Sequence, residues 1–121
     1  MSTIKDKNLA TIGQQEVDWA ARQMKVLEEI KTEFSSSKPL NGLNIGACMH
    51  VTKETANLML TLKAAGANVA LCASNPLSTK DSVAAYLSEN DIEVHAVHGV
   101  SNDDFFKHLN SVLDTNPDIT M

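Results

Sequence analysis

Several features that define specialised classes of protein are scarce in this sequence. Aromatic residues make up 4% of its 121 residues, which argues against a platform of aromatic rings that stacks on nucleic-acid bases. Ten lysines and arginines against fifteen aspartates and glutamates leave a net charge of −5, so a phosphate backbone would be repelled on average. The composition therefore predicts no nucleic-acid partner.

Cysteines and long apolar runs are equally scarce. Cys48 and Cys72 are too few to staple a small secreted domain, so we expect free thiols and a cytoplasmic location. No apolar stretch approaches the ~18–20 residues that a membrane-spanning helix needs. No basic segment followed by an apolar one opens the chain, so we expect neither a secretion signal nor membrane association.

What the sequence does contain is typical of one globular domain. Apolar residues make up 43% and charged residues 21%, close to the average of globular proteins. A chain of 121 residues fits one domain and can bury roughly two-thirds of its unfolded surface. We therefore expect one folded unit with one main core.

The spacing of apolar residues predicts alternating helices and strands. Steps of three and four predict a leading helix over about residues 14–34, which the serines before Pro39 end. We expect strands at residues 43–49, 67–72 and 92–97 and a fourth from residue 118, and helices at 52–65, 79–89 and 102–113. The strand starts repeat every 24 or 25 residues, as in βαβ units. The prediction is an α/β fold, a parallel sheet with flanking helices of the Rossmann-like or flavodoxin-like three-layer kind, incomplete at its last strand.

In an open parallel sheet, ligands bind beyond the carboxyl ends of the strands. The first such junction contains His50, Thr52 and Glu54. A histidine there can titrate near neutral pH, while Thr52 is a good N-cap and Glu54 suits the positive end of a helix. Residue types alone favour the structural roles over the functional ones.

The other two junctions also have structural explanations. Ser78 with Asp81 is typical of a capping box at the start of the second helix, and Ser101 with Asp104 repeats that pattern at the third. Cys48 and His50 alternate onto one strand face, but two ligands do not make a zinc site, so we predict no metal. No Gly-x-Gly or Walker motif occurs, so we expect no dinucleotide site in this stretch.

Longer strings carry a resemblance to a known family. The chain resembles adenosylhomocysteinase, also called S-adenosylhomocysteine hydrolase, nearly throughout and in order, through LATIGQQEVDWAARQMKVL (residues 9–27), PLNGLNIGACMHVTKETA (39–56) and GANVALCASNPLSTKD (66–81). The strings HVTKET and SNPLST within them are specific to that family. The members of the family are several times longer than this chain.

The resemblance implies a reaction, a cofactor and a partner. The family hydrolyses S-adenosyl-L-homocysteine reversibly to adenosine and L-homocysteine, using a tightly held NAD that transiently oxidises the ribose. Residues 1–121 would be the N-terminal portion of the substrate-binding domain, with the NAD-binding domain absent from this stretch. The small-molecule substrate would be the partner, and the complete enzyme would be a homo-oligomer.

The resemblance also implies roles for individual residues. His50 matches a histidine near the ribose 5′ position, where it could act as acid or base. Thr52 matches a threonine that contacts the nucleoside, and Glu54 matches a glutamate that reads the adenine edge. Met49 matches an apolar residue of the adenine pocket. With the resemblance added, the functional roles of the first junction become the favoured ones.

Ser74 and Asn75 match a loop near the active site of the family, so both are predicted to bind substrate. Lys25 stands where the family usually has proline, in a helix that we expect to lie away from the chemistry. Lys80 replaces a common glutamine, and the chain ends before an Asp-Asp-Gly stretch that contains an essential aspartate. Residues 1–121 alone are therefore predicted to be inactive.

Two alternatives stay open. The first is a truncated, non-catalytic nucleoside-binding or regulatory domain of the same family. The second is an unrelated flavodoxin-like or receiver-like module. A receiver needs a phospho-accepting aspartate at a central strand tip, whereas the third strand here is followed by His98 and Gly99.

Overall fold

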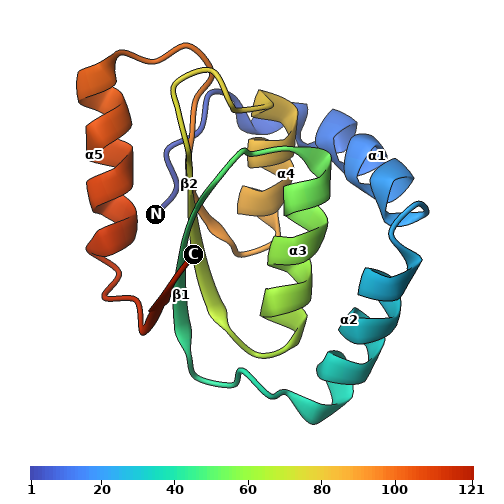
Figure 1. Ribbon diagram of the computed structural model, residues 1–121. Helices are drawn as coiled ribbons and strands as arrows, with labels where there is room; N and C mark the ends of the chain where they lie inside the picture. The colour runs from blue at the N-terminus through green and yellow to red at the C-terminus, as the bar shows by residue number, and fades with distance from the viewer.

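Four parallel strands form one sheet in the order β3-β2-β1-β4 in the computed structural model, which describes residues 1–121 (Figure 1). The central strands β1 (Asn44–Met49) and β2 (Asn68–Ala73) pair along their whole length, from Asn44 opposite Asn68 to Met49 opposite Ala73. The edge strands β3 (Glu93–His95) and β4 (Ile119–Thr120) are short. All four predicted strands are confirmed, although β3 is shorter than the six residues expected.

Helices cover both faces of the sheet. They are η1 (Lys7–Leu9), α1 (Ala10–Ala21), α2 (Lys25–Ser37), α3 (Lys53–Ala64), α4 (Asp81–Glu89) and α5 (Asn102–Leu113). In Figure 1, α3 and α4 lie on one face of the sheet and α5 on the other, which confirms the three-layer α/β prediction. Helices α1 and α2 pack outside α3 and α4 as an additional layer. None of these helices combines the length and apolar character needed to cross a membrane.

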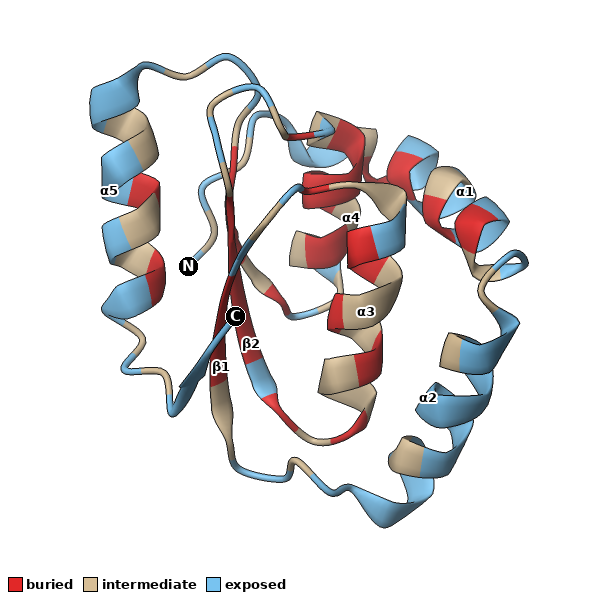
Figure 2. Ribbon diagram, viewed as in Figure 1, coloured by how far each residue is buried: buried red, intermediate tan, exposed pale blue.

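The main core lies between the sheet and the α3 and α4 layer. Leu71 of β2, Met59 of α3 and Val83 of α4 are fully buried there. Figure 2 shows the buried residues concentrated along β1, β2 and the inner sides of these helices, whereas α2 is mostly exposed. A smaller apolar cluster of Ala70, Cys72 and Val112 joins β2 to α5. The near-continuous apolar character of β1 and β2 follows from burial on both faces.

The single leading helix predicted over residues 14–34 is wrong, because α1 ends at Ala21 and α2 begins at Lys25. The N–H groups of Gln23 and Met24 donate to the carbonyls of Ala20 and Ala21 in tighter three-residue turns. The two helices pack on the same layer, α1 on α3 and α4 and α2 on α3. The apolar spacing therefore continues across the break between the helices, so the sequence pattern did not reveal the break.

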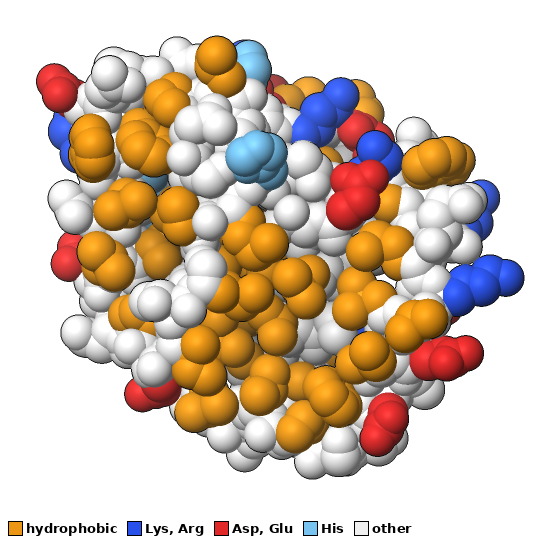
Figure 3. All heavy atoms as spheres, viewed as in Figure 1, with side chains coloured by type: hydrophobic (Ala, Val, Ile, Leu, Met, Phe, Trp, Pro, Cys, Tyr) orange, Lys and Arg blue, Asp and Glu red, His pale blue; other side chains and the backbone are white.

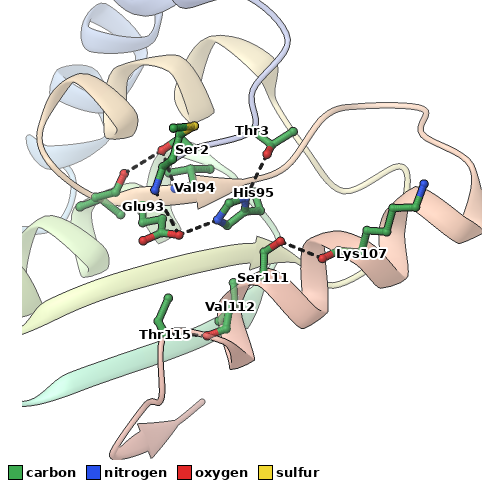
Figure 4. Close-up of polar contacts among 11 residues, drawn as sticks. Ser2, Thr3, Glu93, Val94, His95, Lys107, Ser111, Val112 and Thr115 are labelled. Atoms are coloured by element: carbon green, nitrogen blue, oxygen red, sulfur yellow. Dashed lines mark hydrogen bonds and ion pairs between the residues drawn. The ribbon is translucent and has the colours of Figure 1, made fainter.

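The first residues of the chain lie along the outer edge of β3, which the sequence did not predict. Thr3 forms a parallel bridge with His95, donating its N–H to the Val94 carbonyl (2.8 Å) and accepting from Ala96 N–H (3.0 Å). Figure 4 shows Ser2 and Thr3 beside β3, with the His95 ring between Thr3 and Glu93. The ring nitrogens of His95 lie 3.1 Å from the Thr3 hydroxyl and 2.8 Å from the Glu93 carboxylate.

Candidate functional site

The loops that follow β1 and β2 are held together beyond the ends of the strands. Val51 donates its N–H to the Ser78 carbonyl (2.8 Å) and accepts from the Lys80 N–H (2.9 Å), so that Val51 and Thr79 form a parallel bridge. Val51 is fully buried. The carboxyl edge of the two central strands is therefore a fixed platform, and the predicted site residues lie on it.

Three of these residues form one hydrogen-bonded group. Nδ1 of His50 and the Ser74 hydroxyl share a hydrogen bond, and the Ser74 hydroxyl lies 3.3 Å from the Ser78 hydroxyl. Ser78 donates its hydroxyl to the Asn75 carbonyl (3.0 Å) and accepts from the Asn75 N–H (3.2 Å). Since Nδ1 of His50 is engaged, the exposed ring offers Nε2 to a ligand.

The side chain of Asn75 also shapes its own loop. Its Oδ1 accepts from the Leu77 N–H (2.9 Å), and the Pro76 carbonyl accepts from the Gly99 N–H (2.8 Å). The oxygen of the Asn75 amide is therefore used in the turn. The amide NH2 group donates to no protein group and is free to bind a ligand acceptor.

Thr52 is the N-cap of α3, as predicted, because its Oγ1 accepts from the Thr55 N–H (3.4 Å). Glu54 lies in the first turn of the same helix and is exposed. The pKa of Glu54 lies below its usual value, first because the carboxylate accepts a hydrogen bond from its own backbone N–H and then because Lys53 lies 3.3 Å away. Together these two effects outweigh burial, which acts to raise the pKa. The carboxylate is therefore ionised at neutral pH and accepts hydrogen bonds.

A cavity of about 630 Å³ lies between α2 and α3. Its walls are mostly apolar, and its lining residues are Gln23, Met24, Lys25, Val26, Leu27, Ile30, Met49, Glu54, Thr55 and Leu58. In the view of Figure 3, which is that of Figure 1, apolar side chains gather over the lower part of the molecule, toward α2. The volume is in the usual range for a small-molecule site, and Glu54 is the one carboxylate in the wall.

This cavity also bears on the expectation for Lys25. The helix that carries Lys25 was expected to lie away from the chemistry, yet Lys25, Met24 and Leu27 line the same cavity as Met49 and Glu54. The helix break at residues 22–24 turns the first residues of α2 toward α3. Sequence reasoning missed these wall residues, and the only available signal was the apolar character of Val26 and Ile30, which remain exposed on α2.

The predicted residues therefore fall into two neighbouring groups. Met49 and Glu54 line the cavity, whereas His50, Ser74 and Asn75 belong to the hydrogen-bonded group on the platform. They come from the same two junctions, and Met49 and His50 are adjacent in the chain. An apolar cavity with an acceptor, next to an exposed imidazole, can bind a flat polar ring and move a proton near it.

The capping box predicted for Ser78 and Asp81 is wrong. Asp81 is the first residue of α4, the N-cap Lys80 makes no side-chain capping bond, and the Asp81 carboxylate accepts from the His98 N–H (2.9 Å). Lys80 instead pairs with Glu16 of α1 at 3.6 Å. The matching pattern at α5 is confirmed as a cap, because Ser101 accepts from the Asp104 N–H (3.1 Å).

The remaining candidates concern metal binding and the reactivity of Cys72. No group of three or more His, Cys, Asp or Glu side chains could hold a metal ion. Burial, followed by the influence of neighbouring Cys48, raises the pKa of Cys72 to about 12. Cys72 is therefore a protonated thiol at neutral pH and packs as a small apolar side chain beside Ala70 and Val112.

The fold and the site define a parallel α/β domain whose candidate site lies at the carboxyl edge of its sheet. The chain belongs to the S-adenosyl-L-homocysteine hydrolase family, whose model matches residues 1–121. It is 49% identical over 119 residues to adenosylhomocysteinase of Aquifex aeolicus and 47% identical over 118 residues to that of Sulfolobus acidocaldarius. It is also 45% identical over 119 residues to S-inosyl-L-homocysteine hydrolase of Methanococcus maripaludis. Each comparison covers 98% of this chain but 28% or 29% of the relative.

Proposed function

We propose that this chain is the N-terminal portion of the substrate-binding domain of an adenosylhomocysteinase. The complete enzyme would split S-adenosyl-L-homocysteine reversibly into adenosine and L-homocysteine. The observation that carries the proposal is the ionised Glu54 carboxylate in the wall of an apolar cavity beside the His50–Ser74 pair. Family membership over the whole chain supports it.

The cavity suits the purine ring of the substrate. Met49, Leu27 and Leu58 offer apolar walls, and Glu54 offers an acceptor to the amino group of adenine. Burying the flat ring between apolar side chains supplies most of the affinity, while the charge-assisted hydrogen bond supplies selectivity. Thr55 lies in the same wall, positioned by the Thr52 cap.

The platform suits the ribose end of the substrate. With Nδ1 engaged by Ser74, the free Nε2 of His50 can hold or release a proton at the 5′ carbon, where the thiol leaves and water enters. The free NH2 group of Asn75 can donate to a ribose hydroxyl. Thr52, at the start of α3, contacts the nucleoside between the two groups.

NAD is the cofactor that the family resemblance implies, but the residues present here do not fit it. The turns after β1 and β2 contain no glycine, and the turn after β3 contains only Gly99, so none forms a close cradle for a pyrophosphate. We assign no step of the reaction to a cofactor on this chain. The complete enzyme would hold NAD on other residues, and residues 1–121 alone would not turn over substrate.

A second candidate is hydrolysis of S-inosyl-L-homocysteine, which the name of the Methanococcus maripaludis relative favours. Hypoxanthine presents an oxygen acceptor where adenine presents an amino donor. A carboxylate at that position repels the oxygen, although it can accept from the neighbouring ring N–H of hypoxanthine. If Glu54 reads the amino group of adenine, the protein should bind adenosine more tightly than inosine. If the second candidate is correct, it should bind inosine more tightly than adenosine.

Nucleoside binding to Glu54→Ala distinguishes these possibilities. Loss of one partner of a charge-assisted hydrogen bond costs about 1.5–3 kcal/mol, or roughly 10–150-fold in affinity. We expect that loss for adenosine and a much smaller one for purine riboside, which lacks the amino group. Equal losses for both ligands would contradict adenine reading, and tighter binding of inosine than adenosine by the unaltered chain would favour the second candidate.

We further propose a cytoplasmic location and a homo-oligomeric state for the complete enzyme. The two free thiols support a reducing compartment. Exposed apolar residues such as Val26 on α2 and Phe106 on α5 support burial against further protein surface.

A further inference from the structure

Cys48 and Cys72 lie directly opposite each other on the two central strands. They are register partners in the parallel pair of β1 and β2, so both side chains point to the same face of the sheet. That face carries α5, since Cys72 packs with Val112 of that helix. Cys48 is exposed and Cys72 is buried, so one thiol is accessible and the second lies covered beside it on the neighbouring strand.

The geometry of parallel strands disfavours a direct disulfide between these residues. Neighbouring strands lie about 4.7–4.9 Å apart, and the side chains of parallel partners leave the sheet in the same direction. Their Cβ atoms are therefore held at nearly the strand spacing, while a disulfide needs Cβ atoms about 3.5–4.5 Å apart. A single atom bridging the two sulfurs removes that mismatch, because it lengthens the link between them.

The two cysteines also lie close to the proposed active site along β1 and β2. Two residues beyond Cys48 is His50, and two residues beyond Cys72 is Ser74. The hydrogen bond between His50 and Ser74 continues the pairing of the same two strands by one more step. The two cysteines and the His50–Ser74 pair are therefore linked through only one intervening pair of strand residues, Met49 and Ala73.

We propose that Cys48 and Cys72 form a two-thiol chelating site for soft, thiophilic metal ions and trivalent arsenicals, and that its occupancy displaces the His50–Ser74 pair. Sulfur ligands select soft ions of this kind, and two sulfurs satisfy an arsenical that carries one organic group. The site is separate from the nucleoside cavity, whose wall contains neither cysteine. It does not depend on which nucleoside the protein binds.

Phenylarsine oxide is the probe with the simplest chemistry. The exposed Cys48 sulfur attacks arsenic first, and Cys72 closes the ring. Each thiol gives up its proton, two sulfur–arsenic bonds form, and the arsenic–oxygen bond breaks. The oxygen leaves as water with both protons, so arsenic stays trivalent, no sulfur is oxidised and no further reactant is needed.

Native mass spectrometry with a competing small dithiol tests the site. We expect the folded, reduced chain to bind one phenylarsenic group with loss of one water, and to lose both free thiols together. In the unfolded chain the thiols are separated by 24 residues, and closing that loop should weaken retention on the order of 100-fold. Equal retention by folded and unfolded chains, or no uptake by the folded chain, would overturn the site.

Single-cysteine variants provide the matched controls. Cys48→Ser changes an exposed residue and should keep the fold by circular dichroism, yet should not retain the arsenical against the dithiol. Cys72→Ala should behave in the same way, and if this buried substitution prevents folding, Cys48→Ser still decides. Retention by the folded Cys48→Ser variant equal to that of the unaltered chain would contradict chelation by the pair.

Histidine ring resonances test the effect on the platform. Binding of phenylarsine oxide should shift the His50 ring signals and leave those of exposed His98 unchanged. A bound arsenical with an unchanged His50 signal would overturn the coupling to the active site.

Discussion

Gly13 of α1 lies against the backbone of Ser82 in α4, so closely that a Cβ atom on Gly13 would lie 2.0 Å from the Ser82 carbonyl oxygen. The same junction is polar, because the Ser82 hydroxyl donates to Glu16 of α1 at 2.7 Å. This contact fixes α1 on α4, and α1 in turn sets where α2 begins. The position of α2 in the cavity wall therefore depends on the absence of a side chain at Gly13, which does not line the cavity.

Gly13→Ala should destabilise the fold. In a free helix, alanine would be favoured over glycine by about 1 kcal/mol, but here the new methyl group meets backbone atoms that cannot rotate away. Overpacking of this kind costs about 1–3 kcal/mol in free energy of unfolding. Urea unfolding would measure the change, with Ser36→Ala on exposed α2 as a control expected to shift little. Equal or greater stability of Gly13→Ala would contradict the close approach.

The cavity wall from α2 predicts a second effect. Leu27→Ala should weaken adenosine binding about 5–30-fold, because about 1–2 kcal/mol of apolar contact is lost. Phe34→Ala is the matched control on the same helix, since Phe34 is half-buried but does not line the cavity. Calorimetric titration would compare the two. Weakening by Phe34→Ala equal to that by Leu27→Ala would indicate that α2 acts only through stability.

His108 predicts a pH dependence of stability. Burial lowers its pKa, the charge of His95 on β3 and that of Lys107 lower it further, and Asp104 acts in the opposite direction. The unfolded state then binds the proton more readily as the pH falls through the ordinary value near 6.5, so the folded state loses stability on acidification. The contribution is complete above that value and is lost below it.

Thermal unfolding between about pH 7.5 and about pH 5.5 measures this loss. His108→Gln should flatten the dependence, while His98→Gln, which changes an exposed histidine, should leave it unchanged. Glu93 and the other carboxylates titrate in both variants, so their effect cancels in the comparison. A slope that His108→Gln leaves intact would assign the acid sensitivity to other groups.

His50 predicts a selective loss of catalysis in the complete enzyme. His50→Asn should slow release of homocysteine by roughly 100–10,000-fold, the usual contribution of an acid or base, while adenosine affinity changes little. His98→Asn provides the control, because His98 is an exposed histidine whose backbone, rather than its ring, makes the structural contact with Asp81. A parallel loss of affinity and rate would make His50 a binding residue instead.

The elements of the sheet were largely predictable from the sequence. Most residues of β1 and β2 are buried, so their apolar runs mark the strands within one residue, and Thr52 and Ser101 cap helices as expected. The break between α1 and α2 was not predictable, because Met24 keeps the apolar spacing while its backbone leaves the helix. Local patterns cannot show where two helices separate when both pack on one layer.

The candidate site was also predictable only in part. The strand junctions and the family strings placed His50, Glu54, Ser74 and Asn75 on one edge, since parallel strands must bring their carboxyl ends together. The wall from α2 depends on tertiary packing, so neither spacing nor composition revealed Met24 or Leu27. Asp81 failed as a capping residue for a similar reason, because its partner, the His98 N–H, lies 17 residues away.

Backbone amide chemical shifts, followed while adenosine is titrated into the chain, show whether a nucleoside binds at the carboxyl edge of the sheet. We expect the largest changes at Met49, His50, Glu54 and Thr55, where the cavity meets the platform. Asn44 and Asn68, at the opposite ends of the same strands, should not move. Changes centred on those amino ends or on α5, or no changes at any adenosine concentration, would contradict a nucleoside site at this edge.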